Sequence, residues 1–364
     1  MHSAELETPA LLIDLDRMES NLCRVAGYAR EHDLRLRPHT KTHKIPDIGR
    51  LQIELGAAGL TVAKVGEAQV MLASGTPDLL VAYPVIGHTK LQRLMEVARR
   101  ARLTVALDSA QAARGLSDAA RAAELTIGVL VEADLGLHRC GVAPGEDLIA
   151  LARAVDRLPH LRLEGAAFYP GHIRSAAEEN RRPIDQLAAD VAQLVEDFRA
   201  AGLPLQILSA GSTPLLYQSH RFPGVNEIRP GTYVFNDVNC VRAGVAAWED
   251  CAASILTTVV SAARPGYFIV DGGSKTFSSD RPAGSTEVSF GHLVEAPEAV
   301  FYQLNEEHGY IDARKCQREF QIGDRLRIVP NHICVAMNLH EQVYGCRRDQ
   351  VERVWRVEGR GKLQ

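Results

Sequence analysis

Short runs of aliphatic and β-branched residues alternate with longer stretches rich in Ala, Leu and Arg over the first two thirds of the chain. The longer stretches, among them 90–101, 109–123 and 183–202, repeat apolar residues every three or four positions, which predicts amphipathic helices. The short runs predict eight strands, near residues 35–39, 59–63, 78–85, 102–108, 126–133, 162–169, 205–209 and 227–229. This alternation predicts a parallel (β/α)8 TIM-like barrel, and a doubly wound open sheet is the main alternative.

Beyond about residue 240 the pattern changes, because turns interrupt β-branched runs and helical periodicity almost disappears. This texture predicts a second, mainly antiparallel β domain at 241–364, after a barrel domain at 1–240. The apolar run at 10–16 precedes the eight predicted strands and is surplus to the barrel. Residues 8–16 could therefore pair with the β domain.

Composition and charge exclude several classes of protein. The chain has 364 residues, 41 basic and 45 acidic, so it has no excess of positive charge with which to bind nucleic acid. Seven cysteines without a CxxC motif argue against a disulfide framework and a structural zinc knuckle, and they favour a reducing cytoplasm. No run of about 18 apolar residues occurs, so we expect neither secretion nor a membrane partner.

The first barrel strand ends in RPHTKTHK, residues 37–44, which holds two lysines, two histidines and an arginine. A solvated basic loop would account for this composition. Crowded positive charge and desolvation also lower the pKa of a lysine, and a neutral amine is what a Schiff base requires. Lys275 in the GGSK segment is a rival amine, although an exposed lysine in a glycine-serine hairpin is the simpler interpretation.

Several later segments offer groups that suit an anionic ligand. Arg139, in GLHRCG at 136–141, follows the strand at 126–133 and could meet an oxyanion or serve as an ordinary ion-pair member. Small residues in SAGSTP at 209–214 would let backbone amides approach a phosphate. A second small-residue turn follows the next strand, at Gly231 and Thr232. Barrels commonly bind phosphate after their last strands.

The segment PNHIC at 330–334 places His332 and Cys334 two residues apart. In a strand this spacing points both side chains to the same face. Imidazole and thiolate together suit zinc or a similar borderline cation, and two ligands are too few for a closed structural site. The alternative interpretation is a half-buried histidine beside a small apolar cysteine.

Together these segments resemble the fold-type III pyridoxal phosphate enzymes, of which alanine racemase is the best-known member. More closely, the chain resembles the metal-dependent D-serine dehydratase and D-threonine aldolase family. The segments TPALLIDLDRMESN, RPHTKTHK, EADLGLHRCG, SAGSTP, EIRPGTYVFND and PNHIC occur in that family's order and span nearly the whole chain. RPHTKTHK followed by a late HxC is the most specific part of the resemblance.

The resemblance implies roles around the cofactor, pyridoxal 5'-phosphate. Lys41 would form the Schiff base, Arg139 would face the phenolic oxygen, and Arg229 would point at the pyridine nitrogen. Tyr169 would pack near the ring. The phosphate would be held by the small residues of the two late turns, with an aromatic residue beside them: Gly211, Ser212, Gly231, Thr232 and Tyr233.

The resemblance also implies that His332 and Cys334 bind a divalent metal, zinc or manganese, next to the β-hydroxyl group of the substrate. The segment PGHIR at 170–174 departs from the family pattern and leaves His172 as a candidate acid/base or partner of a metal-bound water. A homodimer is implied as well, because racemase relatives build their sites across a dimer interface.

The resemblance implies a lyase acting on small D-β-hydroxy-α-amino acids. Dehydration with loss of ammonia is slightly favoured over aldol cleavage, because the cysteine of HIC and the threonine of KTHK resemble the dehydratase branch. Racemisation is a further alternative, but it has no use for a metal at the β-carbon. A non-enzymatic cofactor-binding protein is disfavoured by the β domain, since such proteins are usually single barrels.

Overall fold

The computed structural model describes residues 1–364. The chain divides into two compact units, the barrel unit (Arg24–Gly231 with Gly361–Gln364) and the β unit (Met1–Cys23 with Thr232–Arg360). The division falls at Thr232 and not at residue 240, where the change of texture had placed it. The segment from Thr232 to 240 packs into the β unit, where the carbonyl of Phe235 accepts a hydrogen bond from the amide of Ala252 at 2.6 Å.

Eight parallel strands form the sheet of the barrel unit, in the order β2-β9-β8-β7-β6-β5-β4-β3. An isolated parallel bridge between His39 and Thr61 joins its two ends, beyond β2 and in β3, and closes the barrel. The predicted fold class is therefore confirmed, and every predicted strand is present. The strands are β2 (Arg35–Leu36), β3 (Leu60–Val62), β4 (Asp78–Val81), β5 (Arg102–Leu107), β6 (Ile127–Ala133), β7 (Leu161–Phe168), β8 (Ile207–Ala210) and β9 (Glu227–Ile228).

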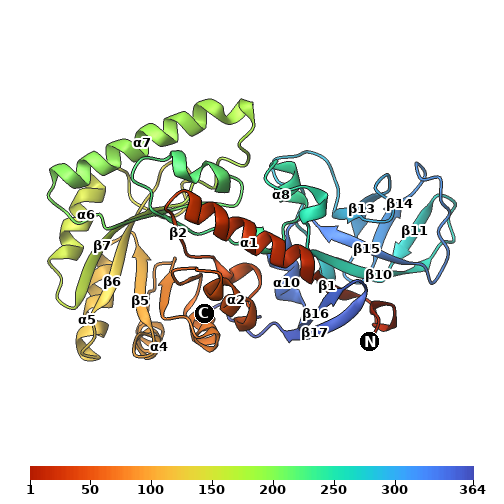
Figure 1. The fold of residues 1–364 in the computed structure, drawn as a ribbon, viewed down its shortest axis with the longest axis horizontal. Coiled ribbons are helices and arrows are strands. Elements are labelled where there is room, and N and C mark those ends of the chain that lie inside the picture. The colour runs from red at the N-terminus through yellow and green to blue at the C-terminus, as the bar shows by residue number, and fades with distance from the viewer. The chain divides into compact units, whose positions relative to one another are not determined.

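Helices connect successive strands, and Figure 1 shows α4, α5 and α6 beside strands β5, β6 and β7. Their apolar faces pack on the sheet, as Leu187, Val191 and Leu194 of α7 show by being buried. None of the helices combines the length and the apolar character that a bilayer span requires. The helices up to β8 are α1 (Leu15–Glu31), α2 (Pro46–Glu54), α3 (Val65–Met71), α4 (His88–Ala98), α5 (Ala110–Ala122), α6 (Glu146–Asp156) and α7 (Arg181–Ala200).

A buried ion network fills part of the barrel interior. The Nε atom of Arg37 donates to Oε2 of Glu227 and its Nη1 atom donates to Oδ1 of Asp78, each at 2.8 Å. The hydroxyl of Ser209 donates to the other oxygen of Glu227 at 2.7 Å. Burial alone would lower the pKa of Arg37, but the two carboxylates raise it above its ordinary value. This cation is therefore structural, since its charge is matched in place.

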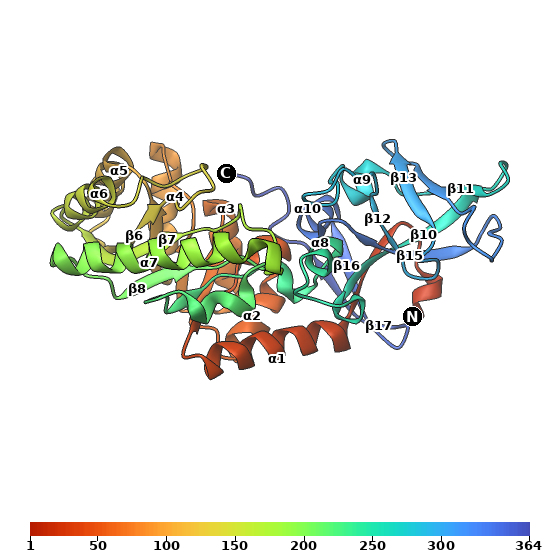
Figure 2. The ribbon, with the colours of Figure 1, turned by 90° about the horizontal axis from the view of Figure 1, so that it is seen from above.

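The β unit contains a second sheet, in which β1 pairs antiparallel with β10 and parallel with β16. Figure 2 shows β10, β15 and β12 of this unit near one another, in keeping with their antiparallel pairing. Strand β1 lies within residues 8–16, the segment that was surplus to the eight barrel strands and was expected to pair with the β domain. The strands are β1 (Ala10–Asp14), β10 (Ala253–Ser261), β11 (Tyr267–Val270), β12 (Gly291–Leu293), β13 (Val300–Leu304), β14 (Gly309–Asp312), β15 (Arg325–Pro330), β16 (Gln342–Arg347) and β17 (Gln350–Arg356).

Three short helices interrupt the β unit: α8 (Val238–Arg242), α9 (Ser274–Phe277) and α10 (Ile333–Leu339). The strand geometry considered for His332 and Cys334 does not occur, because β15 ends at Pro330 and α10 begins at Ile333. In a strand, the amide of Ile333 would donate a hydrogen bond to a carbonyl of a neighbouring strand. Here that amide donates to the side chain of Asp237 at 3.1 Å and starts a helix.

Candidate active site

The two lysines of RPHTKTHK have different environments in the barrel unit. Lys44 is buried, and its Nζ atom lies 3.2 Å from Oε1 of Glu67. Lys41 lies in a single 3-10 turn (Thr40–Thr42) that begins four residues after the end of β2, is half-buried and has no carboxylate partner. The structure thus leaves Lys41 as the available amine of this segment. The sequence alone shows two crowded cations in this segment, whereas in the structure the charge of Lys44 is balanced by Glu67.

The ends of β8 and β9 present two buried polar atoms without a protein partner, Oγ of Ser212 and Nη1 of Arg229. Ser212 is 3% exposed and Arg229 8% exposed. Buried polar groups nearly always have a hydrogen-bond partner, so these two atoms indicate a polar ligand. The other terminal nitrogen of Arg229, Nη2, donates to the carbonyl of Phe168 at 3.1 Å, which fixes the direction of the guanidinium.

Two glycines keep the same strand ends open. Gly211 adopts φ +111°, which favours glycine, and it precedes Ser212. A Cβ atom on Gly231 would lie 2.9 Å from the carbonyl oxygen of His39 and from Oγ1 of Thr42. A side chain would therefore not fit at either position without strain. Small residues and unpartnered donors at adjacent strand ends fit the phosphate and ring of pyridoxal phosphate.

Arg139, Tyr169 and His172 come from two neighbouring loops of the barrel unit. The guanidinium carbon of Arg139 lies 4.8 Å from the centre of the Tyr169 ring, within cation-π range. The exposed His172 ring lies against the loop of Arg139, since a Cβ on Gly136 would be 3.1 Å from it. The predicted residues of these two loops therefore do lie together, and their roles remain predictions.

His39 and Glu132 also belong to this region and were not singled out from the sequence. Burial, which removes the ring from water, lowers the pKa of His39 well below its ordinary value of 6.5. The positive charges of Lys41 and Arg229 lower it further. Burial raises the pKa of Glu132, which lies near Arg229 and Arg139. The only signal for them was their presence in the motifs RPHTKTHK and EADLG. They show that Lys41, Arg139 and Arg229 share one electrostatic environment.

In the β unit, His332 and Cys334 occupy the start of α10. Although they are not in a strand, the two side chains are within hydrogen-bonding reach of each other. Cys334 raises the pKa of His332 well above 6.5, burial opposes this change, and Asp237 adds to it. The pairing predicted from HxC is therefore present, and a helix start produces it.

Thr232 and Tyr233 also lie in the β unit, in a 3-10 turn (Thr232–Val234). Oγ1 of Thr232 lies 3.8 Å from Sγ of Cys334, and the Tyr233 side chain is buried. Their predicted place beside the phosphate stays a prediction.

The donor set of the β unit fits a divalent cation of borderline softness. Nδ1 of His332 lies 3.1 Å from Oδ2 of Asp237, which leaves Nε2 to face a metal. The chain has no group of three or more His, Cys, Asp and Glu side chains arranged to hold a metal ion. A metal bound by His332 and Cys334 would therefore keep open positions for water or substrate, as catalytic metals do.

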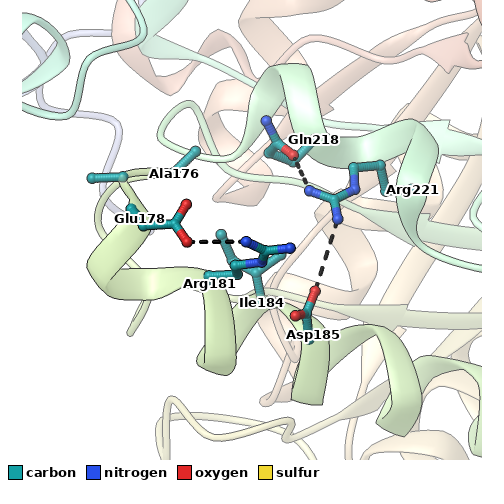
Figure 3. A pocket seen from close by; sticks show the side chains of 8 residues that line it. Ala176, Glu178, Arg181, Ile184, Asp185, Gln218 and Arg221 are labelled. Atoms are coloured by element: carbon teal, nitrogen blue, oxygen red, sulfur yellow. Dashed lines mark hydrogen bonds and ion pairs between the residues drawn. The ribbon is translucent and has the colours of Figure 1, made fainter.

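A separate pocket of about 220 Å³ lies in the barrel unit and contains none of the predicted site residues. Figure 3 shows that its two arginines already have partners. Arg181 pairs with Glu178 at 3.0 Å, and Arg221 binds Gln218 at 2.8 Å and lies 3.8 Å from Asp185. The pocket therefore offers no unpaired cation. Its lining is Ala176, Ala177, Glu178, Arg181, Ile184, Asp185, Gln218 and Arg221.

Two family models match the chain. The model described as "Alanine racemase, N-terminal domain" matches residues 13–238, and the model described as "Putative serine dehydratase domain" matches residues 252–346. The first covers most of the barrel unit and the second covers most of the β unit. The first match contains the segments from RPHTKTHK to EIRPGTYVFND, and the second contains PNHIC.

Characterised relatives and solved structures match nearly the whole chain. D-threo-3-hydroxyaspartate dehydratase of Delftia sp. is 36% identical over 90% of this chain and 91% of the relative. The structure of D-threonine aldolase from Filomicrobium marinum has a TM-score of 0.93 and 32% identity, covering 99% of this chain and 98% of that one. A cysteine-to-alanine mutant of D-threo-3-hydroxyaspartate dehydratase in the metal-free form has a TM-score of 0.89 and 32% identity, covering 98% of each chain.

Proposed function

Because this chain belongs to the fold-type III pyridoxal phosphate enzymes, in the group of aldolases and dehydratases, we propose that it is a metal-dependent lyase of D-β-hydroxy-α-amino acids. The observation that carries the proposal is the His332–Cys334 pair at the start of α10. A racemase needs two opposed bases and no metal at the β-carbon. A lyase gains from a cation that binds the β-hydroxyl group.

Three residues of the barrel unit would hold the cofactor. Lys44 is paired with Glu67, so Lys41 supplies the one amine of its segment without a carboxylate partner. Lys41 would bind the cofactor covalently. Ser212 would donate its unpartnered hydroxyl to the phosphate, and Arg229 would direct Nη1 at the pyridine nitrogen. Bound pyridoxal phosphate supplies an electron sink for negative charge on the substrate. The protein residues fix its orientation.

Two residues of the β unit would hold the metal. His332 would use Nε2, since Nδ1 is engaged with Asp237, and Cys334 would use its thiolate. A divalent cation supplies a Lewis acid that stabilises an oxygen as it leaves or loses its proton. Solved mutants of D-threo-3-hydroxyaspartate dehydratase replace a histidine and a cysteine two positions apart, the spacing of His332 and Cys334, and the cysteine mutant is in the metal-free form. This parallel supports the ligand assignment.

Lys41 would move the proton in dehydration. Its amine would accept the proton from Cα of the substrate. In aldol cleavage a base would remove the proton of the β-hydroxyl group instead, and the exposed His172 is the candidate for that step. The choice between the reactions thus depends on which of these two protons is removed first.

Dehydration with release of ammonia is slightly favoured, with aldol cleavage to glycine and an aldehyde as the second candidate. Cys334 supports dehydration, because a solved D-threo-3-hydroxyaspartate dehydratase also has a cysteine two positions after a histidine, and its cysteine-to-alanine mutant is in the metal-free form. The TM-score of 0.93 to a D-threonine aldolase supports the second candidate. The substrates named for these relatives, D-threonine and D-threo-3-hydroxyaspartate, define the class that we propose.

The proposal is tested by the metal and enantiomer dependence of turnover. Protein loaded with pyridoxal phosphate should consume D-threonine or D-threo-3-hydroxyaspartate in the presence of Zn²⁺ or Mn²⁺, and it should lose that activity after exhaustive chelation. The L enantiomers serve as the control. Full turnover after chelation, in both the parent protein and Cys334→Ala, would overturn the proposal.

A further inference from the structure

Asp237 is a buried carboxylate at the junction of two helices in the β unit. Its side chain is 1% exposed. Oδ1 accepts from the amide of Cys240 at 2.9 Å and caps α8, for which Asp237 is the residue before the helix. Oδ2 accepts from the amide of Ile333 at 3.1 Å, the first residue of α10. One carboxylate therefore caps two helices.

The same Oδ2 atom also lies 3.1 Å from Nδ1 of His332. His332 precedes α10 and makes no capping hydrogen bond with its own side chain. Its ring is therefore held from the outside, by a residue 95 positions earlier in the chain. The amide of Ile333 and the ring of His332 share one acceptor, which ties the ring to the start of the helix that carries Cys334.

A carboxylate only accepts hydrogen bonds, so the contact requires the proton of the neutral ring to be on Nδ1. The lone pair is then on Nε2, the opposite corner of the ring. Partners of this kind fix the tautomer and orientation of histidines that bind metals, and their loss typically weakens metal binding about 10- to 100-fold.

We propose that Asp237 is the positioning residue of the metal site: it selects the His332 tautomer with the proton on Nδ1 and aims Nε2 at the cation that Cys334 also binds. The inference rests on the proposed function, because that function includes the metal. Asp237 is the aspartate of the YVFND segment, and the sequence alone did not indicate a role for it.

The test compares zinc affinity and stability in three variants, using protein loaded with pyridoxal phosphate, stripped of metal and titrated with Zn²⁺ against a zinc-binding dye. Asp237→Ala removes the acceptor, and the Kd for Zn²⁺ should rise about 10- to 100-fold. Asp237→Asn can turn its oxygen to His332 and Ile333 and its NH₂ group to the amide of Cys240. This variant should lose the α8 cap and melt earlier, while its zinc affinity changes less than that of Asp237→Ala.

Asp271→Asn is the matched control. Asp271 is a carboxylate of the same unit that accepts from the amide of Thr258 at 2.8 Å and from the hydroxyl of Thr8. It should lower the melting temperature without changing the Kd for Zn²⁺. A purely structural role for Asp237 would make stability and zinc affinity fall together in both of its variants, and equal zinc affinity in Asp237→Ala and the parent protein would overturn the inference.

A measurement on the parent protein covers the case in which Asp237→Ala does not fold. In ¹⁵N-histidine-labelled, zinc-loaded protein, the ring signals of His332 can be assigned by their loss in His332→Gln. We expect a proton on Nδ1 and zinc on Nε2, and the reverse arrangement would overturn the inference. A parent protein that bound no zinc at all would refute the metal part of the proposed function. Zinc affinity that was equal in the parent protein and in Asp237→Ala would refute only the role of Asp237.

Discussion

The ammonium group of Lys44 lies 3.2 Å from Oε1 of Glu67, and both side chains are buried. Glu67 also accepts from the amide of Ala63 at 2.8 Å through its other oxygen. Lys44 adopts φ +57°, an uncommon conformation for a residue other than glycine, and its amide donates to the carbonyl of Thr40 at 2.8 Å. Three residues earlier, Lys41 has no such partner. Two lysines of one motif are thus separated by their surroundings into a structural cation and an available amine.

Removing the structural cation should destabilise the barrel unit. In Lys44→Met, Glu67 would be a buried charge without a partner, and loss of one member of a buried pair costs about 3–5 kcal/mol of unfolding free energy. Urea unfolding of the purified variant measures this change. A loss below about 1 kcal/mol would show that Glu67 does not depend on Lys44, since that is the range of an exposed pair.

Removing the available amine should abolish covalent binding of the cofactor and leave the fold intact. Lys41→Ala should lose the visible absorbance of the bound cofactor and at least 1,000-fold in turnover, on the order of the loss when a catalytic nucleophile is removed. Lys275→Ala is the control, because Lys275 is exposed and ion-paired to Glu306 and Glu307, which raise its pKa. An unchanged absorbance in Lys41→Ala would refute the assignment of this lysine.

Replacing Ser212 should separate cofactor affinity from stability. The buried hydroxyl has no partner in the protein, so Ser212→Ala removes an unsatisfied group and should not lower the melting temperature of the cofactor-free protein. Loss of one hydrogen bond to a charged phosphate should weaken cofactor binding about 10- to 150-fold, since such a bond contributes roughly 1.5–3 kcal/mol. Fluorescence titration with pyridoxal phosphate measures the affinity. A destabilised variant with full affinity would contradict the role of Ser212.

Acid should destabilise the protein partly through His43. This ring is buried, accepts from the amide of Ile45 at 3.1 Å, and has its pKa lowered by burial from 6.5 to about 4. The neutral ring is the form that the fold accommodates. Its contribution is therefore complete above pH 6.5 and is lost as the pH falls toward 4, by about 3 kcal/mol, since one pKa unit equals about 1.4 kcal/mol.

The difference between the parent protein and His43→Gln isolates this effect, because other groups titrate in the same range. The curve of unfolding free energy against pH should be flatter for His43→Gln between pH 6.5 and 4. Parallel curves for the two proteins would show that His43 contributes nothing to the acid sensitivity.

The periodic patterns allowed the barrel to be predicted because strand and helix periods depend on residues close together in sequence. All eight predicted strands are present, although β2 and β9 have only two residues each where three to five were expected. Closure through the bridge between His39 and Thr61 depends on residues outside regular strands, which periodicity does not mark.

The partners of charged residues could not be predicted, because they come from distant parts of the chain. Arg37 is neutralised by Glu227 and Asp78, and no local pattern links these three positions. The same reason applies to PNHIC. The spacing of His332 and Cys334 identified the pair, but the aspartate that caps α10 lies far away in sequence, so the sequence did not reveal a helix start there.

Product analysis distinguishes a lyase of D substrates from a racemase. Protein loaded with pyridoxal phosphate and Zn²⁺ or Mn²⁺ is incubated with D-threonine and D-threo-3-hydroxyaspartate, with the L enantiomers as controls. Our account predicts cleavage of the D substrates only, with 2-oxobutyrate and ammonia from D-threonine if dehydration dominates, or glycine and acetaldehyde if the aldolase alternative holds. Interconversion of enantiomers without carbon-oxygen or carbon-carbon cleavage would contradict the account, since the enzyme would then be a racemase.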